Sequence, residues 1–295
     1  MTGAFVFSIG EGNYAMNGCA VSERHRYKKW KIIPIAVCGV FAVLFLITAV
    51  YLGDYYHSDQ LARNALVTDD IVQVNQTLKD MILFSPKEPV AGFIFYPGGK
   101  VEYTAYAPLL HSLAEHGLFC VLVKMPCNLA VLDVNAAEGI QEMFPEIENW
   151  YIGGHSLGGS MAASYVSEHA EEYDGLILLA AYATKDISQC GLEVLSIYGN
   201  EDGILDMDKY TKNLINLPER LEEYEIEGGC HAQFGNYGRQ DGDGIPGISG
   251  ERQREITVRC ILEWMNEGDI GFAVKMNKNL MMVHNIGIIL SLCQG

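Results

Sequence analysis

Short apolar runs alternate with amphipathic segments from about residue 69 to residue 266 of the 295-residue chain, and this order limits the possible folds more than any other feature. A strand that is buried on both faces of a sheet requires a continuous apolar run, whereas a helix that covers a sheet requires apolar residues at helical spacing. Strands that alternate with helices form a parallel sheet with helices on both faces. The sequence therefore predicts an α/β fold with a mostly parallel central sheet.

Two short runs, IVQVNQT and DMILFSP, begin the series and predict an antiparallel pair of strands. The further predicted strands are VAGFIFYP, LFCVLVKMP, NWYIGG, YDGLILLAAY, LEVLSIYG and LEEYEIEGG. Helices are predicted at about residues 103–116, 133–145, 157–170, 207–217 and 250–266.

An uncharged apolar segment precedes this region, at residues 32–52. At about 1.5 Å per residue its 21 residues span roughly 30 Å, the thickness of a bilayer's hydrocarbon core. Five Lys and Arg residues lie between residues 24 and 31, which predicts a cytoplasmic N-terminal side and an extracytoplasmic domain. The segment is therefore expected to be a membrane signal anchor, with secretion after signal cleavage as the alternative.

These features divide the chain into five parts. They are a cytoplasmic segment at 1–31, a transmembrane signal anchor at 32–52, a juxtamembrane linker at 53–68, the α/β domain at 69–267 and a C-terminal tail of unknown role at 268–295.

The charge of the chain is negative and unevenly distributed. The formal net charge is −17, yet residues 1–31 carry +3, so the remainder carries −20. A surface of this sign repels a phosphate backbone, and no basic stripe with interleaved aromatic residues is present. Binding of nucleic acid is therefore not expected.

The segment YIGGHSLGGSMAASYV predicts a strand, a tight turn and a helix, with Ser156 at the turn. A residue at such a turn adopts a strained backbone conformation that requires small neighbours, and Gly154 and Gly158 satisfy this requirement. The turn exposes the serine hydroxyl above the carboxyl ends of the strands. Ser156 is therefore the candidate nucleophile.

A nucleophilic serine requires a base and an acid that orients the base. His231 follows the last predicted strand in the loop EIEGGCHAQFG, and Asp202 follows the strand LEVLSIYG. Ser156, Asp202 and His231 thus follow different strands in the order serine, acid, histidine. Three other acids, Glu201, Asp206 and Asp208, lie near Asp202 in the sequence.

Two backbone amides are expected to form the oxyanion hole. One is that of Leu157, which follows the nucleophile; the other comes from YPGGKVEY, with Gly99 preferred over Lys100. Cys230, beside His231, is the rival nucleophile, but it follows a strand where a base is needed. The run QDGDG at residues 240–244 predicts a turn rather than a calcium loop, because the later ligands of such a loop are missing.

Together these motifs resemble the α/β-hydrolase superfamily, in particular its compact members without a lid, which are similar to dienelactone hydrolases and to bacterial membrane-anchored relatives. The resemblance covers about residues 90–267, through FYPGGKVEYTAYAPL, GHSLGG, YGNEDGIL and GGCHAQFGNYG. It implies an eight-stranded sheet and hydrolysis of an ester, thioester or amide. Many members have His-Gly where this chain has Pro97-Gly98, and dienelactone hydrolases use a cysteine where it has Ser156.

The expected function is therefore that of a serine hydrolase acting on a small or polymer-borne acyl compound. Two alternatives use the same fold, namely an inactive binding module at the cell surface and an acyltransferase. The constellation implies no metal and no organic cofactor.

Overall fold

The computed structural model describes residues 19–267, which belong to two units that adjoin at Gly53 and Asp54. The expected cytoplasmic segment lies mostly outside these residues, and the tail at 268–295 lies wholly outside them.

The first unit is the single helix α1 (Cys19–Gly53). Its window Ala36–Gly53 has a mean hydropathy of 2.4, and it is the one helix in residues 19–267 that is long and apolar enough to cross a membrane. A signal sequence has the same properties. The apolar helix predicted at 32–52 is thus present, and it extends further toward the N-terminus than the apolar run itself.

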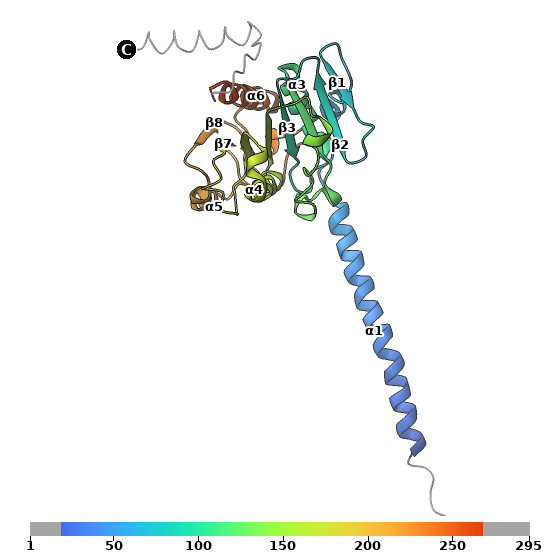
Figure 1. Ribbon diagram of the computed structural model, residues 1–295. Helices are drawn as coiled ribbons and strands as arrows, with labels where there is room; N and C mark the ends of the chain where they lie inside the picture. The colour runs from blue at the N-terminus through green and yellow to red at the C-terminus, as the bar shows by residue number, and fades with distance from the viewer. Residues whose placement is uncertain (1–18, 268–295) are drawn as a thin grey trace, which may run out of the picture. The chain divides into compact units, whose positions relative to one another are not determined.

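The second unit is built on one eight-stranded sheet (Figure 1). Its strands are β1 (Val72–Asn75), β2 (Met81–Pro86), β3 (Ala91–Tyr96), β4 (Leu118–Val123), β5 (Trp150–His155), β6 (Gly175–Leu179), β7 (Glu193–Gly199) and β8 (Leu221–Ile226). The order is β1-β2-β4-β3-β5-β6-β7-β8. β2 pairs antiparallel with β1 and β4, and all other pairs are parallel. The predicted fold is therefore confirmed.

Burial explains why the central strands are continuous apolar runs. Every residue of β3, β4, β5 and β6 is buried, because helices cover both faces of the sheet. The edge strand β8 exposes its four central residues, three of which are glutamates. Charges on an edge strand hinder its pairing with another chain.

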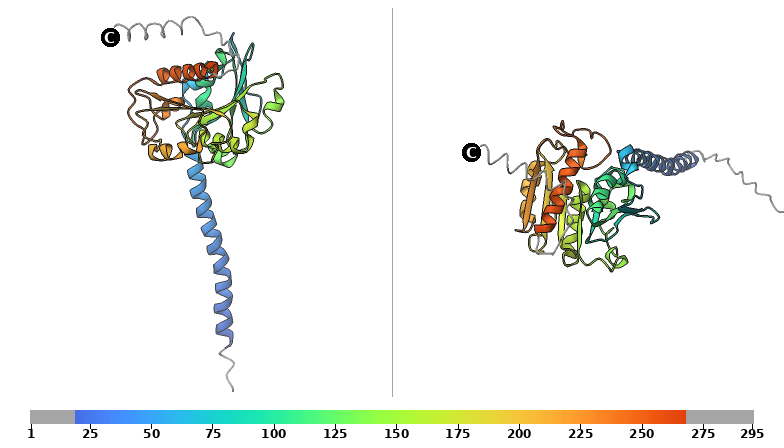
Figure 2. Two further views of the ribbon diagram at one scale, coloured as in Figure 1. Left: turned by 60° about the vertical axis from the view of Figure 1, so that its left-hand side comes forward. Right: turned by 90° about the horizontal axis from the view of Figure 1, so that it is seen from above.

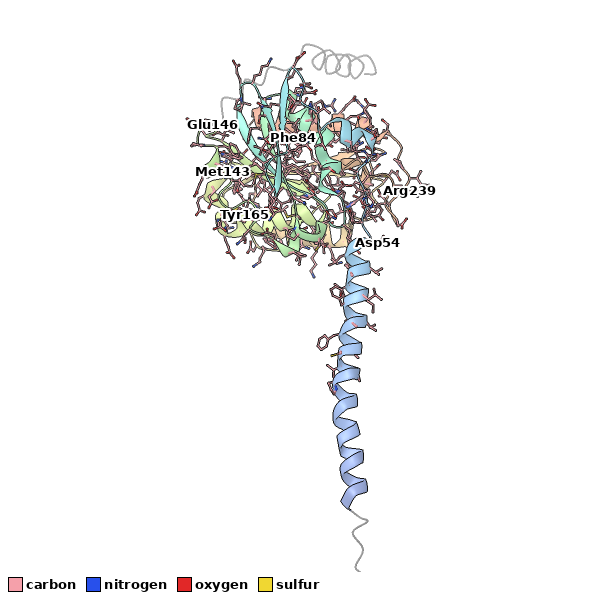
Figure 3. All side chains as sticks on the ribbon, turned by 90° about the vertical axis from the view of Figure 1, so that its right-hand side faces the viewer. Asp54, Phe84, Met143, Glu146, Tyr165 and Arg239 are labelled. Atoms are coloured by element: carbon pink, nitrogen blue, oxygen red, sulfur yellow. The ribbon has the colours of Figure 1, made fainter. Side chains whose placement is uncertain are left out.

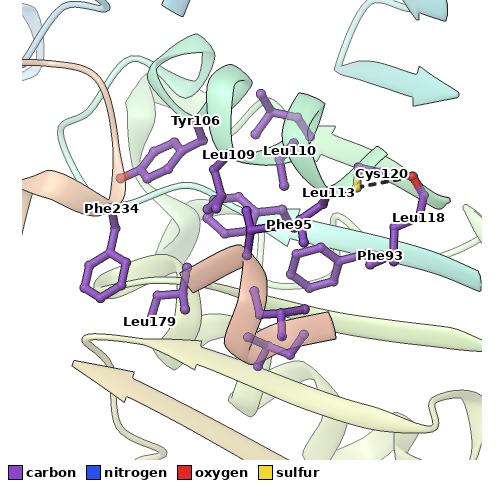
Figure 4. Close-up of a cluster of buried hydrophobic side chains, with 14 of the residues drawn as sticks. Phe93, Phe95, Tyr106, Leu109, Leu110, Leu113, Leu118, Cys120, Leu179 and Phe234 are labelled. Atoms are coloured by element: carbon purple, nitrogen blue, oxygen red, sulfur yellow. Dashed lines mark hydrogen bonds between the residues drawn. The ribbon is translucent and has the colours of Figure 1, made fainter. Parts of the chain in front are cut away.

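The helices of this unit are α2 (Gln60–Asn64), α3 (Ala107–Glu115), α4 (Leu157–His169), α5 (Met207–Asn213) and α6 (Gly250–Glu267). α3 and α6 cover one face of the sheet, where their side chains pack with Phe93 and Phe95 (Figures 1 and 4). α4 covers the opposite face, against Ile94 and Ile152 (Figure 2). The two faces hold separate apolar cores.

The prediction of a helix at residues 133–145 is wrong. Turns and a short 3₁₀ segment, Gln141–Met143, take its place. Gly139 has a φ of +74°, which interrupts a helix, and Tyr96 of β3 binds the segment through its hydroxyl. That hydroxyl donates to the Val134 carbonyl and accepts from the Ala137 amide, both at 2.8 Å, so a side chain satisfies backbone groups that a helix would satisfy itself.

Residues 54–59, which the sequence predicts as part of a linker, pack against the domain; we call them the strap. The Tyr56 amide donates to the Lys100 carbonyl, and the Tyr56 carbonyl accepts from the Glu102 amide, both at 2.8 Å. The Tyr56 hydroxyl accepts from the Asp241 amide at 3.0 Å. Figure 3 shows Asp54 on the same side of the domain as Arg239. The strap therefore contacts two loops at the carboxyl ends of the strands.

Candidate active site

Ser156 lies in a strained turn between β5 and α4. Its φ of 53° and ψ of −123° are conformations that few residues other than glycine adopt. The Ser156 amide donates to the Leu179 carbonyl of β6 at 2.9 Å, and the Ser156 carbonyl accepts from the Ser160 amide at 3.1 Å. Hydrogen bonds on both sides thus hold the strained residue in place.

The glycines beside Ser156 are required by the close approach of β3. A Cβ atom on Gly154 would collide with the Tyr96 carbonyl oxygen, and one on Gly158 would collide with the carbonyl oxygens of Tyr96 and Pro97. The turn and the loop after β3 are therefore in direct backbone contact. This contact brings Leu157, the first residue of α4, next to Gly99, which its side chain contacts.

Asp202 and His231 form a buried pair. Nδ1 of His231 lies 2.8 Å from Oδ2 of Asp202, and the two side chains are only 2% and 1% exposed. The other oxygen, Oδ1, accepts from the amides of Ile204 and Leu205 at 2.8 and 2.7 Å. The carboxylate is thus fixed by its own loop and accepts the Nδ1 proton of His231, which leaves Nε2 of the neutral ring free of a proton.

Ser156 and His231 both line a cavity of about 380 Å³, as does Leu157. Because the carboxyl ends of parallel strands meet at one edge of the sheet, residues that follow β5, β7 and β8 come together there. A cavity of about 420 Å³ is lined by other residues of the loop that carries His231, among them Cys230 and Ala232, and none of the three predicted triad residues lines it.

The loop after β3 contains the amides of Gly98, Gly99 and Lys100, of which the sequence predicts Gly99, or else Lys100, as the oxyanion donor. The Gly98 amide donates to the Tyr106 hydroxyl at 3.1 Å, and the Lys100 amide donates to the Asn128 carbonyl at 2.8 Å. Within residues 19–267 the Gly99 amide has no acceptor, and Gly99 lies against the Leu157 side chain. Of the two predicted donors, Lys100 thus has its amide engaged in a hydrogen bond, and Gly99, within the described residues, does not.

Tyr106 connects this loop to His155, the residue before Ser156. Its hydroxyl lies 2.8 Å from Nδ1 of His155, and both residues are buried. Burial lowers the pKa of His155 well below its usual value, and the nearby His231 lowers it further. His155 is thus neutral. The sequence alone does not distinguish Tyr106, since a tyrosine at the start of an expected helix looks the same as a core residue.

The Cys230 thiol does not have the properties of a nucleophile. Burial, with a smaller contribution from Asp243, raises the pKa of Cys230 to about 11, so the reactive thiolate is scarce at neutral pH. Its Sγ donates to the Glu201 carbonyl at 3.5 Å.

One group among residues 19–267, formed by Asp69, His111 and Glu115, brings potential metal-binding atoms together. Nε2 of His111 lies 3.5 Å from Asp69, whereas Nδ1 lies 3.7 Å from Glu115. The two carboxylates face different nitrogens of the ring: Glu115 lies one turn after His111 on α3, and Asp69 comes from the turn before β1.

Comparisons with known proteins agree with this architecture. A family model described as the alpha/beta hydrolase family matches residues 92–255. Among solved structures, an α/β hydrolase called MGS-MChE2, from a metagenome of lagoon sediments at Mar Chica in Morocco, is similar with a TM-score of 0.50 and 15% identity, over 67% of this chain and 99% of its own. A likeness at this identity shows the fold.

Two further structures are similar at lower scores. TT1662 from Thermus thermophilus has a TM-score of 0.48 and 16% identity, over 65% of this chain and 98% of its own. A hydrolase from Thermoplasma acidophilum, described as a predicted CIB-like hydrolase, has a TM-score of 0.49 and 14% identity, over 64% and 98%. A search of curated proteins found no match.

The matched family segment includes more than half of the 295 residues and contains the turn at Ser156 as well as Asp202 and His231. With the eight-stranded sheet and its strand order, this match assigns the fold and the broad class of the protein. The chain belongs to the alpha/beta hydrolase family.

Proposed function

We propose that the chain is a serine hydrolase that cleaves a carboxylic ester, or a thioester or amide, through an acyl-enzyme on Ser156. The observation that supports this proposal is the cavity that Ser156 and His231 share, with Nδ1 of His231 bonded to a buried Asp202 at 2.8 Å. A histidine held in this tautomer has Nε2 available to accept a proton from a serine hydroxyl.

In the proposed mechanism the Ser156 oxygen attacks the acyl carbonyl while His231 accepts the hydroxyl proton at Nε2. Asp202 keeps the ring oriented and stabilises the imidazolium. The amides of Leu157 and Gly99 donate to the oxyanion of the tetrahedral intermediate, aided by the dipole at the N-terminus of α4. His231 then returns the proton to the leaving group, and a water activated by His231 releases the acyl group.

The cavity favours a small, uncharged acyl group. Its apolar lining comes from Leu157, Ala180, Ala181, Ile204 and Leu205. Lys209 and Asp206 also line it, but they pair with each other at 3.0 Å. Their opposite charges cancel, so the pair gives the cavity no net charge that would attract a charged acyl substrate. We expect faster hydrolysis of two- to four-carbon acyl esters than of long-chain esters.

We also propose that α1 anchors the domain in a membrane, with the domain extracytoplasmic. The basic residues between positions 24 and 31 precede the apolar window, and they support this orientation. Secretion after cleavage is the alternative.

The test compares the full chain in detergent with Ser156→Ala and with Ser160→Ala. Ser160 lines the same cavity, but its hydroxyl donates to the Tyr182 carbonyl at 2.8 Å, so it is a matched control. We expect short p-nitrophenyl esters to be hydrolysed and a fluorophosphonate to label the protein. Ser156→Ala should lower kcat by at least about 1,000-fold and abolish labelling, whereas Ser160→Ala should retain both.

A folded chain that neither hydrolyses these esters nor reacts with the fluorophosphonate would contradict the proposal. The binding module would then be the better description. Acyl transfer is distinguished by product analysis, because an added alcohol would divert the acyl group from water.

A further inference from the structure

The turn at residues 240–244 contains a buried carboxylate that the proposed mechanism does not use. Asp243 is 7% exposed, whereas Asp241 and Gly242 in the same turn are exposed. Burying a carboxylate is costly unless hydrogen bonds compensate for the lost water. The surroundings of Asp243 therefore have to supply donors.

Four backbone amides supply them. Oδ1 of Asp243 accepts from the amides of Gly203, His231 and Gly244 at 3.2, 3.2 and 2.9 Å, and Oδ2 accepts from the Ala232 amide at 2.8 Å. All four donors are N–H groups, so the carboxylate is fully engaged. This arrangement also disfavours a calcium ion at the turn, because N–H groups point their positive ends at both oxygens.

The donors belong to the two loops that carry the predicted acid and base. Gly203 follows Asp202 in the loop after β7, and His231 with Ala232 lies in the loop after β8. The Asp243 carboxylate thus binds the backbone of both loops, the one that carries Asp202 and the one that carries His231. Its position fixes the relative position of the two loops.

Close packing of the backbone supports the same connection. A Cβ atom on Gly244 would collide with the Glu201 carbonyl oxygen, and one on Gly203 would lie 2.6 Å from the Gly242 carbonyl oxygen. The turn therefore lies directly against the loop that carries Asp202. Loss of the Asp243 carboxylate would leave buried amides without acceptors.

We propose that Asp243 is a positioning residue for the active site: its carboxylate holds the loops of Asp202 and His231 in the register in which Nδ1 of His231 meets Asp202. The proposal rests on the proposed hydrolase function. Asp243 would act through His231 and Asp202, since no contact between Asp243 and the acyl group is required.

The test uses the full chain in detergent with Asp243→Ala, Asp243→Asn and the control Asp241→Ala. Asp241 is exposed in the same turn, and its variant should behave like the wild type. A displacement of about 1 Å at a reacting group can cost about 100-fold in rate. We expect Asp243→Ala to lower kcat about 100-fold with KM within twofold, and Asp243→Asn, which keeps one acceptor oxygen, to lower it about tenfold.

Hydrogen exchange of the same proteins gives a readout that does not depend on catalysis. Peptides that cover residues 200–205 and 229–234 should exchange faster in Asp243→Ala, whereas a peptide of the central strand β5 should be unchanged. If the wild type is inactive but this pattern appears, the proposed function has failed and the connection between the loops stands.

Two results would overturn the proposal. One is a folded Asp243→Ala protein with kcat within threefold of an active wild type. The other is unchanged exchange in both loops. Should Asp243→Ala fail to fold, Asp243→Asn decides: a lower kcat at unchanged KM supports the positioning role, and an unchanged kcat contradicts it.

Discussion

His155 directly precedes the candidate nucleophile, and its ring centroid lies 4.4 Å from that of His231. The Tyr106 hydroxyl has one proton; because it accepts from the Gly98 amide, that proton is available for Nδ1 of His155. A neutral His155 adds no positive charge beside His231, where an imidazolium forms in the proposed mechanism. Two residues outside the predicted triad thus contact its surroundings: Tyr106 binds the oxyanion loop, and His155 lies beside the predicted base, His231.

Tyr106→Phe tests the contact between Tyr106 and the oxyanion loop. The change leaves the buried Gly98 amide without an acceptor, which should cost about 1–3 kcal/mol of the free energy of unfolding. It should also lower kcat about tenfold, since Gly98 neighbours the predicted oxyanion donor Gly99. Tyr151→Phe is the control, because the Tyr151 hydroxyl has no hydrogen-bond partner within residues 19–267. Equal kinetics for the two variants would contradict the role of Tyr106.

The depressed pKa of His155 predicts a pH dependence of stability. In the unfolded chain this histidine takes up a proton near pH 6.5, whereas in the folded protein it stays neutral to a much lower pH. The stabilisation that a neutral His155 gives the folded protein is therefore fully present above pH 6.5 and is lost as the pH falls. Below pH 6.5 the free energy of unfolding should therefore decrease more steeply with falling pH in the wild type than in His155→Gln. Urea unfolding in detergent at several pH values gives the free energy of unfolding of both proteins. The same dependence on pH in both would refute the lowered pKa of His155.

The elements of the fold differ in how well the sequence predicts them. The central strands could be predicted because burial on both faces imposes continuous apolar runs, and β3 to β6 have them. The segment at 133–145 could not, since the Tyr96 hydroxyl that fixes it comes from a distant strand. The strap resembles a linker in composition, because the backbone hydrogen bonds that help to hold it leave no apolar pattern in the sequence.

The same distinction applies to the candidate site. That Ser156, Asp202 and His231 would lie close together could be predicted, because each follows a strand whose carboxyl end reaches the same edge of the sheet. Their catalytic role stays a prediction. The contacts of Tyr106 and Asp243 could not be predicted, since they connect loops that are far apart in the sequence and have no periodic signal.

The strap can be tested with neighbouring tyrosines. The Tyr56 ring lies 5.6 Å from that of Tyr237, and its hydroxyl accepts from the Asp241 amide. Tyr56→Ala should lower the midpoint of thermal unfolding by several degrees and reduce kcat a few-fold, because the strap contacts the oxyanion loop and the loop after β8. Tyr55→Ala, a half-buried neighbour whose ring contacts only His57 among the aromatic residues of this part of the structure, should change neither. Equal effects of the two changes would show that the strap has no special influence on the site.

At the scale of the whole molecule, charge and the apolar helix point to different environments for the two ends of the chain. The first 31 residues carry a net charge of +3, whereas the rest carries −20. Basic residues before an apolar helix stay in the cytoplasm, and an acidic domain attracts neither anionic lipid headgroups nor nucleic acid. The proposed arrangement therefore has one anchor and a domain that extends into the extracytoplasmic space.

Cys127 offers a direct test of this arrangement. It is a free, exposed cysteine of the domain, whereas Cys190 is half-buried and Cys120, Cys230 and Cys260 are buried. In intact host cells that express the full chain, a charged maleimide that does not cross the cytoplasmic membrane should label the wild type and label Cys127→Ser much less. The reason is that an extracytoplasmic Cys127 meets the reagent without lysis. Labelling of Cys127 that requires lysis of the cells would assign the domain to the cytoplasm and contradict the proposed orientation.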